Sequence, residues 1–240
     1  MKYQRVVPAT FGRRINRFEA VCLLQGQETT VHVKNTGRCL ELLQPGAVVY
    51  LEKALNPNRK TLYSLITVEK GNQRVNIDSQ APNGVFAEAV YSKKIIMPGL
   101  KDPALLRREV RYGSSRFDFA YSADNGQNTF IEVKGVTLEE EGLALFPDAP
   151  TIRGVRHLKE LTSLKQQGSG AAVFFIIQME KVHQFSPNDL MHPEFGQALR
   201  EAAEAGVGIL AFSCRVFPDE ITLHQAIPVC LHPEEEVRNR

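Results

Sequence analysis

The chain has 240 residues, of which 43% are hydrophobic and 23% are charged. These proportions are typical of a soluble globular protein with one or two domains, and they exclude a disordered tail protein, a collagen-like chain and a coiled-coil rod. The 29 basic and 27 acidic residues give a formal charge of +2, which alone says little about partners.

The charge is distributed unevenly along the chain. Residues 1–80 hold 12 basic and 6 acidic residues, a net of +6, whereas residues 81–240 hold 17 and 21, a net of −4. A basic first third is typical of a part that binds a polyanion, and the alternative is an ordinary solvated face. Three arginines of this region are candidates for DNA phosphates: Arg13, Arg14 and Arg17.

The first 80 residues are predicted to form short strands separated by turn signals. The expected strands are residues 18–24, 29–33, 48–53, 62–68 and 74–78. About five such strands indicate a small β-barrel, for which the OB type, a common carrier of nucleic acid, is the natural candidate. A generic small barrel is the alternative.

Residues 81–240 are predicted to form a second, mixed α/β domain. Helices are expected from residue 81, over 151–167 and over 194–205, and strands over 107–112, 116–121, 128–134, 171–178 and 207–216. The apolar run at 171–178 is typical of a strand buried on both faces. The order of these elements predicts a mixed sheet flanked by helices.

Cysteine use and hydropathy bear on the compartment. The four cysteines (Cys22, Cys39, Cys214 and Cys230) form no CxxC pair, no secretory signal is visible, and no apolar run reaches about 18 residues. We expect a cytoplasmic protein with reduced thiols and no membrane association. An oligomer is compatible with the sequence, but no pattern argues for one.

The segment 116–134 carries the chemistry. Alternation places Asp118 on one face of its strand, and Glu132 and Lys134 on one face of the next. A hairpin joining the strands can bring two carboxylates and an ammonium group together. Two carboxylates can hold a hard divalent cation, Mg²⁺ or Mn²⁺, and a lysine beside them can help deprotonate water for phosphodiester attack.

This site depends on the register of the hairpin. A two-residue turn at Asn125-Gly126 would place Asp118 opposite Val133, on the wrong face, so the site requires an odd loop or a bulge. Glu88 of the first helix is a possible third carboxylate. The alternative is an ordinary cross-strand salt bridge.

Other candidates are weaker. Arg153 lies at the start of a predicted helix, where it and Arg156 can meet a phosphate or simply remain exposed beside the helix cap. His157, one turn further on, is either structural or a general acid. The remaining histidines show no zinc-ligand spacing.

Motifs along the whole chain resemble the sugar fermentation stimulation protein A (SfsA) family. They are Asn35-Thr36-Gly37, Asn83, Glu88-Ala89, Glu109, Tyr112-Gly113, Arg116 with Asp118-Phe119, Phe130-Ile131-Glu132-Val133-Lys134, Val136-Thr137-Leu138, Phe146-Pro147-Asp148-Ala149, Thr151, Arg153-Gly154, His157-Leu158 and Glu160-Leu161. Departures are mild: Ile152 stands where the family often has an acid, and Gly135 where it often has a small hydroxyl residue.

The resemblance implies an OB-like domain over residues 1–80 and a nuclease-like domain of the PD-(D/E)xK type over residues 81–240. It implies DNA binding with little sequence preference and a regulatory link to maltose and sugar use. It also implies that Asp118 and Glu132 are metal ligands, Lys134 is the catalytic lysine and Glu88 is the helix acid. Arg116 and Arg153 join the candidate DNA-binding residues.

Three function classes remain open at this point. The first is a metal-dependent DNA phosphodiesterase, and the second is a protein that uses the same fold only to hold DNA. The third, a small-molecule phosphate enzyme, would show no salt-dependent affinity for duplex DNA.

Overall fold

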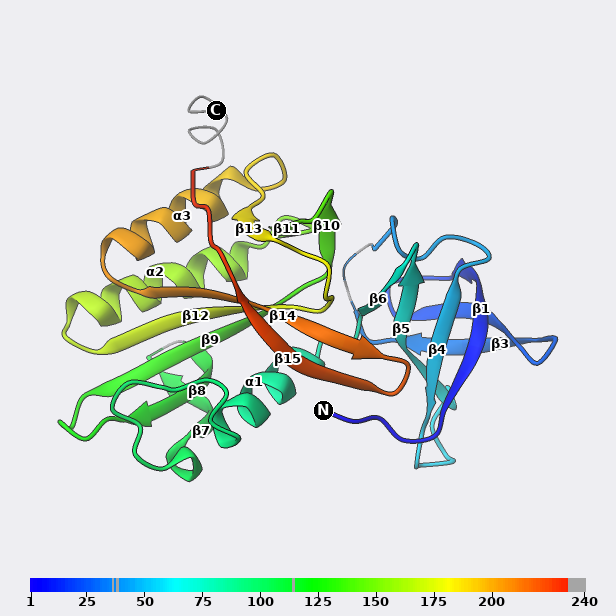
Figure 1. The fold of residues 1–240 in the computed structure, drawn as a ribbon, viewed down its shortest axis with the longest axis horizontal. Helices are drawn as coiled ribbons and strands as arrows, with labels where there is room; N and C mark the ends of the chain where they lie inside the picture. The colour runs from blue at the N-terminus through cyan, green and yellow to red at the C-terminus, as the bar shows by residue number, and fades with distance from the viewer. Residues whose placement is uncertain (36, 38, 114, 233–240) are drawn as a thin grey trace.

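The computed structural model describes residues 1–35, 37, 39–113 and 115–232. Figure 1 shows a β-barrel built from the N-terminal part of the chain beside a larger domain in which helices flank a sheet. The fold class predicted from the sequence, an OB-like barrel followed by a mixed α/β domain, is therefore confirmed.

The barrel strands follow one another in a single closed sheet. Their order is β3-β2-β1-β4-β5-β6, and a parallel pairing of β3 with β5 closes the sheet. The strands are β1 (Val6–Arg14), β2 (Glu19–Leu24), β3 (Gln27–Val33), β4 (Val48–Lys53), β5 (Tyr63–Lys70) and β6 (Gln73–Asn76). Buried apolar residues contributed by each strand fill the interior.

Strand β1 was absent from the elements expected from sequence. It contains Pro8 and two arginines, and only Ala9 and Phe11 within it are buried, so it lacks a clear alternation of apolar residues. A register shift lies between Phe11 and Arg13, where a Cβ on Gly12 would come within 3.0 Å of the Val21 carbonyl oxygen. The bulge keeps β1 paired with β2, although its period-two pattern is interrupted.

The second domain is built on a mixed sheet of order β15-β14-β12-β9-β8-β7. Its strands are β7 (Arg107–Tyr112), β8 (Ser115–Ser122), β9 (Asn128–Val136), β12 (Gly170–Ile177), β14 (Gly208–Phe217) and β15 (Glu220–Ile227). Strands β9, β12 and β14 are parallel, whereas the other pairs are antiparallel. Strand β12 is buried almost throughout, as its apolar run predicts.

Among the described residues of this domain, three α-helices and a small second sheet complete the fold. The helices are α1 (Ala81–Tyr91), α2 (Ile152–Gln166) and α3 (Pro193–Glu204), and a short 3₁₀ turn, η1, covers Pro103–Leu105. The apolar side of α1 packs in one core cluster with Phe119, Ile131 and Phe174, whereas α2 and α3 pack in the other. The small sheet comprises β10 (Leu138–Glu140), β11 (Leu143–Phe146) and β13 (Gln184–Pro187). Strands β10, β11 and β13 were not expected from sequence, because each has four residues or fewer. The longer strand β15 was not expected either.

Hydrogen bonds tie the barrel to the second domain. The Asn76 amide donates to the Gln178 carbonyl at 2.9 Å, and Lys70 Nζ donates to Glu139 Oε2 at 2.8 Å. The first residues of the chain also lie on the second domain, since the Tyr3 amide donates to the Asp219 carbonyl at 2.8 Å. Residues 1–3 thus contact the second domain, although the sequence groups them with the barrel.

Two further features concern the chain as a whole. The four cysteines are buried free thiols. Across the part of the chain that the structure describes, no helix combines the length and apolar character needed to span a membrane.

Candidate metal and active site

The hairpin of β8 and β9 has the odd loop that the candidate site requires. Its strands pair from Ser122 with Asn128 to Phe119 with Ile131, which leaves the five residues 123–127 as the loop. Continuing this register by one position places Asp118 opposite Glu132. The two carboxylates therefore belong to neighbouring strands at the point where regular pairing stops.

Asp118 accepts two hydrogen bonds where the regular pairing of β8 and β9 ends. Its Oδ2 accepts from the Val133 amide at 2.9 Å, and its Oδ1 accepts from Asn83 Nδ2 at 3.0 Å. The carboxylate thus takes the place of a strand carbonyl, and the first turn of α1 supplies the second donor. The resemblance singled out Asn83, but nothing in the local sequence pattern predicted this contact.

Glu132 lies buried between a lysine and a histidine. Its Oε1 is 2.6 Å from Lys134 Nζ and 2.5 Å from His157 Nδ1, and the residue is only 4% exposed. Its Oε2 is buried and has no hydrogen-bond partner among the described residues. An ionised oxygen without a partner is costly to bury, so Oε2 is a vacant acceptor suited to a cation.

His157 connects this cluster to α2. Its Nδ1 faces Glu132, its Nε2 accepts from Arg153 Nε at 3.4 Å, and its ring is 1% exposed and packs near Phe117. These two contacts require the tautomer that carries the proton on Nδ1. The i, i+4 spacing of Arg153 and His157 shows from sequence that they share a helix face. The sequence does not show that this face meets Glu132.

Burial and charge shift the two carboxylates in opposite directions. Burial and the negative charge of Glu132 raise the pKa of Asp118, and the bonds from Val133 and Asn83 offset this only in part. Burial alone would raise the pKa of Glu132, but the hydrogen bond from His157 and the Lys134 ammonium outweigh it and lower that pKa. Glu132 is thus held ionised, whereas Asp118 carries the repulsion between the pair.

The structure does not bring Glu88 to this pair. Glu88 lies on α1 with its side chain 58% exposed and forms an ion pair with the amino group of Met1. It follows Asn83, which does reach Asp118, by five residues, or about 140° around a helix. We therefore do not include Glu88 in the proposed site.

The donor set suits a hard divalent cation. No group of three or more histidine, cysteine or acidic side chains that could hold a metal is found within the described residues. Mg²⁺ commonly uses one or two protein carboxylates and keeps several waters. Asp118 and Glu132, with a buried oxygen unpartnered, fit such a cation.

The candidate DNA-binding arginines occupy different environments. Arg13 is exposed and forms an exposed ion pair with Glu28 at 3.4 Å. Arg116 is likewise exposed and lies 3.4 Å from Glu109. These side chains can exchange a weak protein partner for a phosphate.

Arg14 instead holds loops of the barrel together. Its guanidinium donates to backbone carbonyls of Asn16, Arg17, Asn35 and Gly37 at 2.7–3.1 Å. Those bonds fix the loop after β1 against the loop after β3. Its environment is that of a structural arginine, which the run Arg13-Arg14 alone does not reveal.

Comparisons with known proteins cover most of the chain. A family model described as "SfsA N-terminal OB domain" matches residues 13–77, and one described as "Sugar fermentation stimulation protein RE domain" matches residues 80–220.

Proteins named "Sugar fermentation stimulation protein homolog" are similar over nearly their full lengths. The homologue of Clostridium perfringens (strain 13) is 49% identical over 96% of this chain and 100% of its own, and that of Clostridium acetobutylicum is 48% identical over 93% and 96%.

A solved structure described as Pyrococcus furiosus SfsA in complex with Ca²⁺ superposes with a TM-score of 0.86. It is 30% identical in sequence, over 96% of this chain and 98% of that one. With both domains matched in order along the chain, this protein belongs to the sugar fermentation stimulation protein (SfsA) family.

Proposed function

We propose that this protein binds DNA with little sequence preference and hydrolyses its phosphodiester bonds with the help of Mg²⁺ or Mn²⁺ held by Asp118 and Glu132. The observation that carries the proposal is the buried, unpartnered Oε2 of Glu132 beside the carboxylate of Asp118. In an ordinary cross-strand salt bridge on an exposed face, the second carboxylate oxygen would be in contact with solvent rather than buried.

The residues around the pair have distinct tasks in this proposal. Val133 and Asn83 hold the Asp118 carboxylate, and His157 holds that of Glu132. Both carboxylates therefore keep their positions before a cation binds. A bound divalent cation supplies positive charge that stabilises the charge developing on the phosphate oxygens.

Lys134 contributes a proton-bearing group beside Glu132. Its Nζ is 2.6 Å from Glu132 Oε1, and its side chain remains 16% exposed, so one side can face water or phosphate. From there it can orient the attacking water and offset charge at the phosphate. In this proposal a neighbouring phosphate is bound by Arg153, which contacts His157 from the exposed start of α2.

The names of relatives support the cation and the cellular role. The Pyrococcus furiosus protein is described in complex with Ca²⁺, a hard cation that takes oxygen ligands. Relatives bear the name of sugar fermentation stimulation, and we propose that this protein likewise regulates sugar use, with maltose as the suggested sugar, through its contact with DNA.

A second candidate function is a regulator that binds DNA without cleaving it. The hydrogen bond between Lys134 and Glu132 favours it, because this bond commits one of the three donors of the ammonium group to a contact within the protein. In that case the nuclease fold serves only to hold DNA.

A nicking assay on supercoiled plasmid separates the two candidates. We expect wild-type protein to nick the plasmid with Mg²⁺ or Mn²⁺ but not with EDTA. The variants Asp118→Asn, Glu132→Gln and Lys134→Ala should lose nicking. The control Glu180→Gln, which removes an exposed carboxylate 3.5 Å from Arg215, should nick like wild type.

Two results would decide against cleavage. One is an absence of nicking by pure wild-type protein with either cation, combined with measurable affinity for the plasmid; this supports the non-catalytic regulator. The other is nicking that persists in Asp118→Asn and Glu132→Gln, which would mean that the activity does not come from this pair.

A further inference from the structure

An open pocket lies on the barrel, separate from the carboxylate pair. Its volume is about 620 Å³, and it is lined by Asn16, Arg17, Phe18, Glu19, His32, Arg59, Lys60 and Thr61. These residues come from the loop between β1 and β2, from the start of β2, from β3, and from the loop between β4 and β5. Ligand pockets in proteins commonly span about 300–1,000 Å³, so this one is large enough for a nucleotide.

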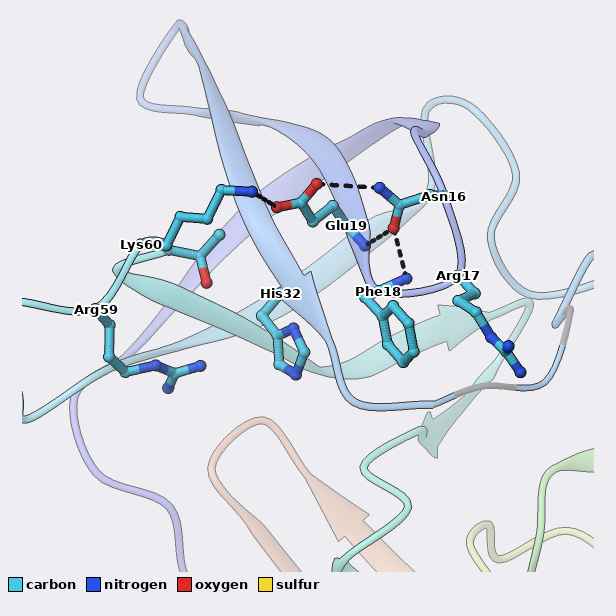
Figure 2. Close-up of a pocket in the computed structure, with 8 residues that line it drawn as sticks. Asn16, Arg17, Phe18, Glu19, His32, Arg59 and Lys60 are labelled. Atoms are coloured by element: carbon cyan, nitrogen blue, oxygen red, sulfur yellow. Dashed lines mark hydrogen bonds and ion pairs between the residues drawn. The ribbon is translucent and has the colours of Figure 1, made fainter.

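Phe18 is the exposed aromatic side chain of this pocket. The residue is 47% exposed, although a phenylalanine in a small barrel normally enters the core. Figure 2 shows the ring between the side chains of His32 and Arg17, all projecting from the same side of the strands. The Arg17 guanidinium lies 5.3 Å from the centre of the ring.

The backbone that presents Phe18 is held rigidly. Asn16 Oδ1 accepts from the Phe18 amide at 2.8 Å and from the Glu19 amide at 3.0 Å, and Arg14 donates to the Arg17 carbonyl at 2.8 Å. An aromatic ring held in place loses little conformational entropy when a ligand covers it. These bonds thus explain how a hydrophobic ring is kept at the surface.

The charges around the ring favour an anion. Arg17, Arg59 and Lys60 line the pocket, and Glu19, which Lys60 contacts at 2.9 Å, is the single acidic residue among the lining residues. In the part of the chain that the structure describes, no acidic side chain forms an ion pair with Arg17 or Arg59. Figure 2 shows these two arginines on opposite sides of the Phe18 and His32 rings.

We infer that this pocket binds single-stranded DNA, with an unpaired base stacked on Phe18 and the flanking phosphates bound by Arg17 and Arg59. The exposed ring can stack against a base, and the basic side chains on either side of it can bind the phosphates on either side of that base. Paired bases of an intact duplex are already stacked on each other and cannot cover the ring. The class of ligand rests on the proposed function, whereas the pocket adds a preference for unpaired strands.

The test measures binding of the full chain to labelled oligothymidylate and to a blunt duplex of equal length, by fluorescence anisotropy in EDTA. Phe18→Ala should weaken single-strand binding at least fivefold, because stacking on one aromatic side chain contributes about 1 kcal/mol or more. Phe18→Trp should bind like wild type. The matched control is Phe217→Ala, since Phe217 is also 47% exposed but lies on β14 of the other domain.

Charge gives a second, independent readout. Arg59→Ala should weaken single-strand binding and reduce the slope of log affinity against log salt by about 0.7, the contribution of one phosphate contact on a single strand. Thermal melting of each variant checks that it is folded, which the exposure of both side chains leads us to expect.

Two outcomes would overturn the inference. Equal single-strand affinity of Phe18→Ala and Phe217→Ala would show that no base stacks on Phe18. An equal loss of duplex and single-strand binding in Phe18→Ala would remove the preference for unpaired strands. Neither outcome depends on cleavage, because EDTA removes the cations and both site carboxylates stay intact, so failure of the nuclease proposal is seen separately.

Discussion

The Oδ2 atom of Asp118 accepts a hydrogen bond from the Val133 amide at 2.9 Å, one position beyond the last regular pair of β8 and β9. The Asp118 side chain accepts the amide hydrogen bond that a carbonyl of the neighbouring strand would otherwise accept. Regular pairing of the two strands ends at Asp118 and Glu132. The same interaction satisfies the backbone and orients the acid toward its partner. Stability and the proposed chemistry are therefore coupled at this residue, and the two acids should respond differently to substitution.

Asp118→Asn should stabilise the cation-free protein at pH 7–8, and by more than it does at pH 5. The pKa of Asp118 is raised in the folded state above its unfolded value of about 3.9. As the pH rises from the unfolded pKa to the folded pKa, the unfolded chain loses its proton first, so the folded protein becomes less stable. Asparagine removes that charge and its oxygen can still accept from Val133, while its amide nitrogen can donate to the Asn83 side-chain oxygen once the Asn83 amide is reversed. Urea unfolding at pH 5 and pH 8 in EDTA measures this. A variant less stable than wild type at pH 8 would contradict it.

Glu132→Gln should have the opposite effect, a loss of about 1–3 kcal/mol at pH 7. The pKa of Glu132 is lowered in the folded state, so its contribution is present above the unfolded pKa and is lost as the pH falls through the folded pKa. The substitution leaves the Lys134 ammonium, 16% exposed, without its anion. Urea unfolding at pH 7 and pH 3 should show a smaller difference in stability between the variant and wild type at pH 3 than at pH 7. A variant as stable as wild type at pH 7 would refute the expectation.

His157→Ala should destabilise the protein by about 1–3 kcal/mol, because it removes a buried hydrogen-bond partner of Glu132. The control is His183→Ala, which removes an exposed histidine and should change stability by less than about 0.5 kcal/mol. Chemical denaturation of both variants makes the comparison. If His157→Ala and His183→Ala behave alike, the contact with Glu132 has no structural importance.

Arg14→Ala and Arg13→Ala should distinguish an arginine that stabilises the barrel from an exposed arginine that contacts DNA. Arg14→Ala removes donors to several backbone carbonyls and should cost about 1.5–3 kcal/mol of stability. Arg13→Ala removes an exposed cation, so stability should stay unchanged while affinity for any DNA sequence falls. Melting and salt-dependent DNA titration of the pair test this. Destabilisation by Arg13→Ala equal to that by Arg14→Ala would overturn the distinction.

Mg²⁺ or Mn²⁺ should raise the melting temperature of wild-type protein, since a ligand at 100 times its Kd stabilises the fold by about 2.7 kcal/mol. Asp118→Asn and Glu132→Gln should lose this response, whereas Glu180→Gln should keep it. Melting curves across a cation titration provide the measurement. An unchanged response in both site variants would place the cation elsewhere.

Local periodicity predicted much of the second domain and part of the site. Alternation along β8 and β9 identified the faces of Asp118, Glu132 and Lys134, and the register argument required the odd loop that the hairpin has. The apolar run of β12 indicated a strand buried on both faces. Each of these inferences depends on residues close in sequence, whose side-chain directions the backbone sets directly.

Tertiary packing decided the remainder. Asn83 reaches Asp118 and His157 reaches Glu132 because two helices lie across the sheet at particular rotations, and Glu88 instead meets Met1. The rotation of a helix about its axis is set by the distant residues against which its apolar side packs. The sequence by itself determined which side chains share a face, whereas only the folded core decided which faces meet.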